Sequence, residues 1–228
     1  MHDQRTLFNV GENNVPATVS FLSPAQDKAL TLTSNRLRAM SVIHQMNALL
    51  QNYIPGQVGR FDDAFNINCV GDYFQTQGTS TILFEAGHYQ NDYCREKSRK
   101  FIALATLQAL LCISVNSVNE NDHANYLQIP ENNTLFFDVL IKNALISNES
   151  IECVNDIGIS YEEILKNEEV LFVPKIKSIG DLSSYFGHKI INAEKKILKE
   201  VNGCKVEINA EFYDIFIGGV KFSLFLNN

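Results

Sequence analysis

The chain has 228 residues, of which 45% are hydrophobic and 10% aromatic, so it can bury the core of one or two globular domains. Its net charge of −7, with Lys and Arg scattered along the chain, argues against a nucleic-acid partner. There is no apolar run of about 18 residues, which predicts no membrane partner. The five cysteines contain no C-x-x-C pair, which favours reduced thiols. Together with the absence of a leader after Met1, this predicts a cytoplasmic location.

The first predicted elements are a short strand and a helix. Residues 17–22 alternate between apolar and polar side chains, which is typical of a strand. A helix is predicted to begin at Thr33 or Ser34 and to end before Pro55. His44 lies on the apolar stripe of this helix, where a histidine is more often packed than a ligand, so we assign it no chemistry.

The next predicted elements are a loop, a strand and a second helix. Residues 55–80 are rich in Gly, Asn and Asp and predict a loop with one short helix near 72–75. A strand is expected at 81–85, and a helix at 92–115 whose wide apolar face predicts burial. Basic residues in its first turns predict either a solvated face or contact with an anionic ligand: Arg95, Lys97, Arg99 and Lys100.

The second half of the chain has a different pattern. Residues 116–133 have no periodicity and contain six asparagines, which favours a linker. We therefore expect one domain at 1–116, a linker at 117–130 and a small β-rich domain at 131–228. Strands are predicted at 135–141, 170–173, 205–208, 214–217 and 221–226, with a hairpin at Gly218-Gly219 and helical stretches at 161–165 and 190–198.

Glu85 is the most informative single residue. It ends the apolar run Thr81-Ile82-Leu83-Phe84 and is followed by a small residue, a glycine and His88. Most acids at strand ends face water. At the edge of a dry core, however, desolvation raises a carboxyl pKa toward the range that suits proton transfer. Position alone leaves both interpretations open.

Two segments together resemble a known family. The segments His2-Asp3-Gln4-Arg5-Thr6 and Ile82-Leu83-Phe84-Glu85-Ala86-Gly87-His88 resemble, in order and spacing, the second half of the zinc metallocarboxypeptidases, the carboxypeptidase A-like enzymes. More narrowly, they resemble a bacterial branch with a short C-terminal domain. The resemblance covers residues 1–116. It implies an α/β fold, with an incomplete mixed-sheet layer and flanking helices followed by the small, mostly β domain.

The resemblance also implies roles for particular residues. His2 matches the third zinc ligand of the family, and Glu85 matches the general base that accepts a proton from the zinc-bound water. The implied cofactor is zinc, and the implied substrate is a peptide or small amide. His88 could support the site from behind the metal ligands, or it could be an ordinary turn residue. Asp3 could orient His2, or it could cap a turn.

The sequence departs from the family pattern at the other zinc ligands. No histidine is followed three residues later by glutamate, so the His-x-x-Glu pair that supplies two ligands in the family is absent. We therefore expect a chain that starts at an internal methionine and has no peptidase activity alone, with some apolar surface exposed. A zinc N-acyl amino acid deacylase and a non-catalytic binding or assembly protein are the alternatives. The sequence does not indicate an oligomeric state.

Overall fold

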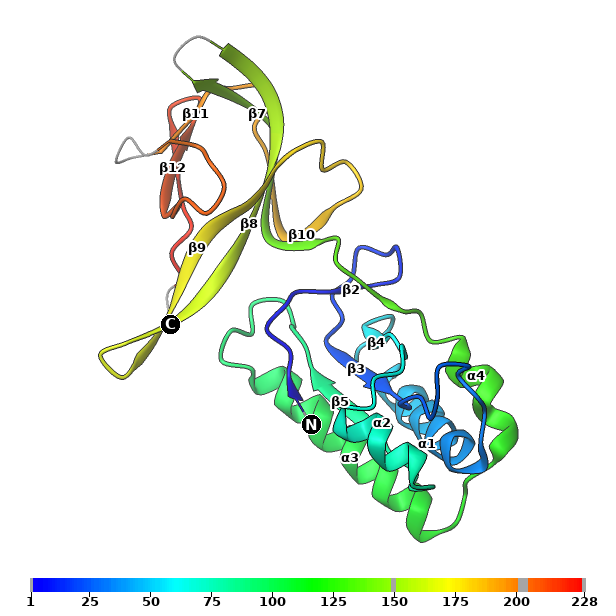
Figure 1. The fold of residues 1–228 in the computed structure, drawn as a ribbon. Coiled ribbons are helices and arrows are strands. Elements are labelled where there is room, and N and C mark those ends of the chain that lie inside the picture. Colours follow the sequence, from blue (N-terminus) through cyan, green and yellow to red (C-terminus); the bar gives the residue numbers. More distant parts are fainter. Residues whose placement is uncertain (1, 149–150, 201–204, 227–228) are drawn as a thin grey trace. The chain divides into compact units, whose positions relative to one another are not determined.

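The protein is a mixed α/β molecule in which strands predominate. The computed structural model describes residues 2–148, 151–200 and 205–226 (Figure 1). The chain divides into two compact units, unit 1 at residues 1–134 and unit 2 at 135–228. In the described part of the chain, no helix is both long and apolar enough to cross a membrane.

Unit 1 is built on a mixed four-stranded sheet. Its strand order is β1-β5-β3-β4. Strands β1 and β5 are parallel, β5 and β3 are antiparallel, and β3 and β4 are parallel. The bounds are His2–Asp3 for β1, Val19–Leu22 for β3, Val58–Arg60 for β4 and Leu83–Ala86 for β5. Strand β4 lies within the segment that the sequence predicted as a loop, because three residues are too few to show a period.

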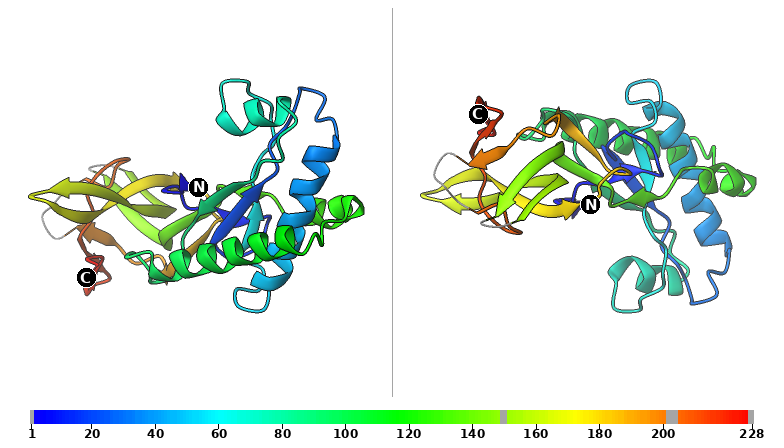
Figure 2. Two further views of the ribbon diagram at one scale, coloured as in Figure 1. Left: turned by 90° about the horizontal axis from the view of Figure 1, so that it is seen from below. Right: turned by 90° about the horizontal axis from the view of Figure 1, so that it is seen from above.

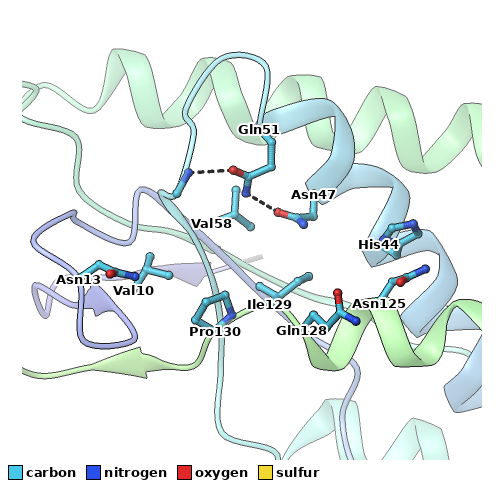
Figure 3. A pocket seen from close by; sticks show the side chains of 11 residues that line it. Val10, Asn13, His44, Asn47, Gln51, Val58, Asn125, Gln128, Ile129 and Pro130 are labelled. Atoms are coloured by element: carbon cyan, nitrogen blue, oxygen red, sulfur yellow. Dashed lines mark hydrogen bonds between the residues drawn. The ribbon is translucent and has the colours of Figure 1, made fainter.

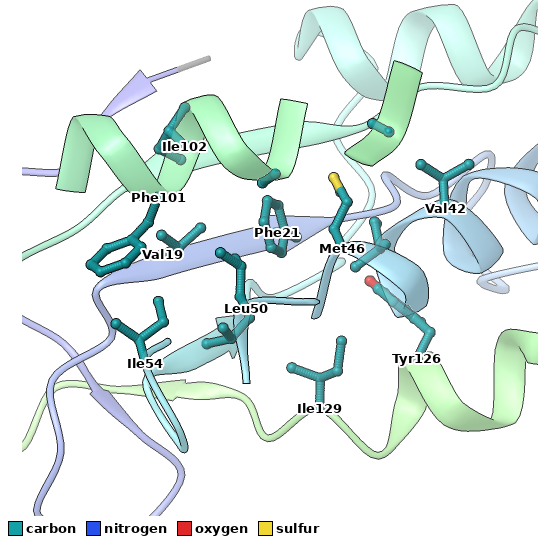
Figure 4. Close-up of a cluster of buried hydrophobic side chains, with 14 of the residues drawn as sticks. Val19, Phe21, Val42, Met46, Leu50, Ile54, Phe101, Ile102, Tyr126 and Ile129 are labelled. Atoms are coloured by element: carbon teal, nitrogen blue, oxygen red, sulfur yellow. The ribbon is translucent and has the colours of Figure 1, made fainter. Parts of the chain in front are cut away.

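Helices of unit 1 cover one face of this sheet. Val19 and Phe21 of β3 pack against α1 (Ser34–Leu50) and α3 (Glu96–Ser114), which lie side by side (Figures 2 and 4). Phe84 of β5 belongs to the same cluster and meets the ring of Phe21 edge to face, with 5.3 Å between ring centroids. Because side chains alternate along a strand, Glu85 points to the opposite face of the sheet.

The segment predicted as a linker belongs to unit 1. Residues 117–130 contain a 3₁₀ turn at Glu120–Asp122 and the helix α4 (His123–Leu127), both of which contact α1. Tyr126 is fully buried, and its hydroxyl accepts a hydrogen bond from the Ser23 amide at 3.2 Å. The strand β6 (Asn132–Asn133) then pairs with β2 (Asn9–Val10). The asparagines suggested a linker, but Tyr126 and Ile129 are both buried in the core of unit 1 and hold the segment against it.

Helix α3 is less buried than the sequence predicted. A single stripe faces the core and includes Phe101, Ala105 and Ala109. The leucines and isoleucine on the other faces are 54–64% exposed: Leu107, Leu110, Leu111 and Ile113. A helix that is apolar all round is buried only where other elements cover it, and the described residues cover one face. The short helix α2 (Val70–Thr76) agrees with the predicted one.

Unit 2 consists of two antiparallel or mixed sheets around its own core. In the larger sheet the order is β10-β7-β8-β9, and β10 pairs with β7 in parallel. The smaller sheet has the order β11-β12-β13. The bounds are Phe136–Asn148 for β7, Ile151–Lys166 for β8, Glu169–Gly180 for β9, Phe186–Asn192 for β10, Leu198–Glu200 for β11, Asp214–Ile217 for β12 and Val220–Ser223 for β13.

The hairpin prediction in unit 2 agrees with the structure, whereas the helix predictions do not. Gly218 and Gly219 join β12 and β13 with φ angles of 57° and 86°, which a two-residue hairpin turn requires. Residues 161–165 lie in β8, and 190–198 run from β10 into β11. Their Glu and Lys content favours a helix locally, but pairing with neighbouring strands overrides that preference. Residues 205–208 form no strand.

Candidate functional site

His2 and Glu85 are neighbours in the sheet although 83 residues separate them in sequence. They are register partners on the parallel strands β1 and β5. Nδ1 of His2 donates a hydrogen bond to Oε1 of Glu85 at 3.0 Å. The His2 side chain is 69% exposed and that of Glu85 only 9%. The pair therefore joins a solvent-facing imidazole to a nearly buried carboxylate.

Burial changes the acidity of Glu85. Desolvation disfavours the charged carboxylate and raises the pKa of Glu85 above its ordinary value, while the neighbouring His2 acts in the opposite direction to a smaller extent. A carboxylate in this setting holds a proton more readily than an exposed one. It can therefore act in proton transfer at a higher pH than an ordinary glutamate.

Arg95 fixes the position of β1. Its guanidinium donates hydrogen bonds to a carboxylate oxygen of Asp3 at 2.5 Å, to the Gln4 carbonyl at 2.8 Å and to the Gly87 carbonyl at 2.8 Å. Two of these groups belong to β1 and its extension, and the third follows β5. Since β1 has only two residues, this clamp contributes much of what aligns His2 with Glu85.

The end of β5 requires a glycine. The Gly87 amide donates to the Thr18 carbonyl at 2.9 Å, and a Cβ at Gly87 would lie 1.9 Å from the Ala17 carbonyl oxygen. The Gly87 carbonyl in turn accepts a hydrogen bond from Oγ of the buried Ser98 at 2.9 Å. This close approach holds the residues after Glu85 against β3 and against the first turn of α3.

The other two predicted site residues have structural partners. The His88 ring donates through Nε2 to the Arg5 carbonyl at 3.0 Å, which ties the turn after β5 to the segment after β1. Asp3 faces Arg95 rather than His2. Arg95 itself was noticed in the sequence only as one of several basic residues. No spacing in the sequence indicates that it reaches back across 92 residues to Asp3.

A shallow hollow of about 390 Å³ opens beside His2 and Asp3, and Glu85 does not line it. Its walls are formed by β1, by the end of β5 and by the first turns of α3, and they include His2, Cys94, Arg95 and Arg99. Arg99 is exposed and forms an ion pair with Glu96. The hollow therefore contains an imidazole, the Asp3 carboxylate and two guanidinium groups, each of which already pairs with a carboxylate of the chain.

Metal ligands are too few at this place. Within residues 2–148, 151–200 and 205–226, no group of three or more His, Cys, Asp or Glu side chains lies close enough to hold a metal ion. The described residues alone thus do not provide the three protein ligands of a catalytic zinc site.

Comparisons with models of protein families, with curated proteins and with solved structures find no match for this chain.

Proposed function

We propose that unit 1 carries part of a hydrolase centre of the zinc metallocarboxypeptidase type, with Glu85 as the general base and His2 as one metal ligand. The observation that supports this proposal is the contact between His2 and Glu85 on adjacent strands, 83 residues apart in sequence. The substrate class we propose is a peptide or a small N-acyl amino acid, which is the class that the resemblance implies.

Glu85 has the properties of a proton acceptor. Its burial raises the pKa of the carboxyl group, and its hydrogen bond to His2 connects it to a side chain that lines the hollow. A general base works best when its pKa approaches the working pH, so desolvation favours this role. Glu85 would accept a proton from the attacking water and pass it to the leaving amine.

Zinc does not fit the described residues by themselves. His2 supplies one imidazole, and the other nearby carboxylate, that of Asp3, is held by Arg95. With a single dedicated ligand, binding would be weak and exchangeable. We therefore propose that further ligands come from outside the described residues and that the chain alone does not hydrolyse peptides.

A zinc titration tests the role of His2. We expect Zn²⁺ to perturb the imidazole NMR signals of His2 more than those of the other four histidines, with rapid exchange and no metal retained after dialysis against a weak chelator. If about one zinc per chain is retained, the chain has a complete zinc site and this part of the proposal is wrong. Perturbation of other histidines without His2 would contradict its role as a ligand.

An activity assay tests whether the chain alone hydrolyses peptides and, if it does, whether Glu85 is the base. The wild-type chain with added Zn²⁺ is assayed on blocked dipeptides and N-acetyl amino acids, beside Glu85→Gln and a matched carboxylate control, Glu12→Gln, at an exposed position. We expect no turnover above background from any of the three. If Glu85→Gln hydrolyses the substrate, Glu85 is not the base. If the wild type and Glu12→Gln hydrolyse it and Glu85→Gln does not, Glu85 is the base and the proposal that the chain alone is inactive is wrong.

A non-catalytic binding or assembly role is the second candidate. It is favoured by the lack of a three-ligand cluster among the described residues and by the fact that the Glu85 carboxylate already accepts a hydrogen bond from His2. In that case His2 and Glu85 would contribute only to the stability of the sheet. Zn²⁺ would then leave the His2 signals unchanged, which separates this candidate from the first.

A further inference from the structure

A second hollow, of about 330 Å³, lies at the opposite edge of the unit 1 sheet (Figure 3). It lies at the C-terminal part of α1, where the turn that leads into β4 meets the segment from α4 to Pro130. Val58 of the edge strand β4 lines it, whereas His2 is on β1 at the other edge. The two hollows are therefore separate sites. A volume of this size is at the lower end of the range for small-molecule sites.

The lining of this hollow is polar but carries no acid and no Lys or Arg. Five of its eleven residues are Asn or Gln, and one is His44. The floor is apolar and buried, with Val10, Val58 and Ile129 between 1% and 3% exposed. In a chain with 20% charged residues, a concave surface without any of them selects against ionic ligands, because a buried ion would have no opposite charge to pair with.

Some polar side chains of the lining are hydrogen-bonded to one another, and others make no hydrogen bond within the described residues. Gln51 donates to the Asn47 side chain at 2.7 Å and accepts from the Gly56 amide at 2.8 Å, which holds both amides in place (Figure 3). Within the part of the chain that the structure describes, the side chains of His44, Asn125 and Gln128 make no hydrogen bond. These three groups stand around the apolar floor with donors and acceptors still available.

We propose that this hollow binds a neutral carbohydrate, as a monosaccharide or as the end unit of an oligosaccharide. A carboxamide presents a donor and an acceptor side by side, so it can bond two adjacent hydroxyl groups of a sugar at once. The apolar floor matches the C–H face of a pyranose ring. A peptide offers only one N–H and one C=O per residue, which would leave several of the clustered amides without a partner.

The experiment uses the full chain and saturation-transfer NMR with D-glucose, D-galactose, D-mannose and N-acetyl-D-glucosamine as separate probes. We expect at least one sugar to bind with millimolar affinity and to shift the side-chain amide signals of Gln51 and Gln128. Gln128→Ala should weaken that binding about tenfold, because one or two hydrogen bonds to the sugar are lost. Gln128 is exposed, so the substitution leaves the core unchanged.

The experiment includes one control variant and a second variant within the hollow. Asn68→Ala removes an exposed amide from a loop elsewhere in unit 1 and should not change sugar binding. His44→Ala is a second variant within the hollow and should also weaken it, with the backbone amide spectrum used to verify folding. The proposal is overturned if none of the four sugars binds, if binding survives both hollow variants, or if N-acetylalaninamide binds there in preference to every sugar.

Discussion

At Glu85, the same desolvation that favours proton transfer reduces stability. Because the pKa of Glu85 is raised in the folded protein, the folded state holds the proton more tightly than the unfolded chain. Stability therefore decreases as the pH rises from the ordinary value of 4.5 through the folded pKa, at about 1.4 kcal/mol for each unit of pKa difference.

We expect Glu85→Gln to remove this decrease, so that the variant is at least as stable as the wild type near neutral pH. Urea unfolding between about pH 4 and pH 8 measures the effect. Glu12→Gln is the matched control and should follow the wild-type curve. If the free energy of unfolding changes equally with pH in all three proteins, burial does not raise the pKa of Glu85.

His188 has the opposite pH dependence. It lies on β10 with its ring 4.9 Å from that of Phe136, and burial lowers its pKa to about 4. Between pH 6.5 and pH 4 the unfolded chain binds the proton and the folded protein does not, so the stability of unit 2 falls as the pH decreases. The loss reaches at most about 3 kcal/mol.

Replacement of this histidine should flatten the acid side of the stability curve. His188→Phe keeps a ring on β10 but cannot bind a proton, whereas the control His123→Gln removes a histidine from unit 1. Thermal unfolding of unit 2 followed at several pH values distinguishes them. An unchanged acid limb in His188→Phe would show that another group is responsible.

Among the elements, β1 depends on contacts made by a loop. Strand β1 forms only one edge of the sheet, and Arg95 bonds to Asp3, Gln4 and the turn after β5. Charge-assisted hydrogen bonds to a partly buried guanidinium contribute about 1.5–3 kcal/mol each in favourable cases. Loss of the guanidinium should therefore detach β1 before it unfolds the unit.

We expect Arg95→Ala to reduce the hydrogen-exchange protection of the Gln4 amide, which donates to the Ala86 carbonyl at 2.9 Å, while amides of β3 stay protected. Arg99→Ala removes only an exposed ion pair with Glu96 and should leave the protection of the Gln4 amide unchanged. Uniform loss of protection over the sheet would contradict a local role for Arg95.

The exposed apolar face of α3 affects self-association rather than stability. Leu107 and Leu111 are more than half exposed and are one turn apart on the same helix. Since neither is part of the core, Leu107→Lys with Leu111→Lys should change the free energy of unfolding by less than about 0.5 kcal/mol per site.

The double variant should instead increase the concentration at which the protein stays monodisperse, because it breaks up an apolar surface. Light scattering as a function of concentration measures this property. Ala105→Lys, on the buried stripe, is the contrasting variant and should unfold unit 1. Unchanged scattering in the double variant would mean that this face does not drive self-association.

At the scale of the whole molecule, each unit has its own core. The cluster that includes Phe21 is confined to unit 1, and the cluster that includes Ile157 is confined to unit 2. Both side chains are fully buried, so truncation to alanine costs about 2–5 kcal/mol in the unit concerned.

We therefore expect two separable unfolding transitions in calorimetry. Phe21→Ala should lower the midpoint of one transition and Ile157→Ala the midpoint of the other. A single transition that both variants shift equally would mean that the two units unfold together.

Local patterns predicted several elements well. The strands at 17–22 and 81–85, the helices α1 to α3 and the turn at Gly218-Gly219 follow from periodicity and from the conformational demands of glycine, which act within a few residues. The helical stretches proposed at 161–165 and 190–198 are strands because hydrogen-bonded neighbours far along the chain decide their conformation. The exposed residues of α3 and the extent of unit 1 depend in the same way on what covers each element.

The sequence by itself determined that this is a mixed α/β protein, because the periods of helices and strands are local properties. It offered His2 and Glu85 as candidate site residues through the resemblance, and their roles stay a prediction. Only the tertiary structure decided that these two side chains are 3.0 Å apart, that Arg95 holds β1 beside β5, and that His44 lines a neutral hollow. Strand register and close packing bring together residues separated by tens of positions, and no local pattern encodes those pairings.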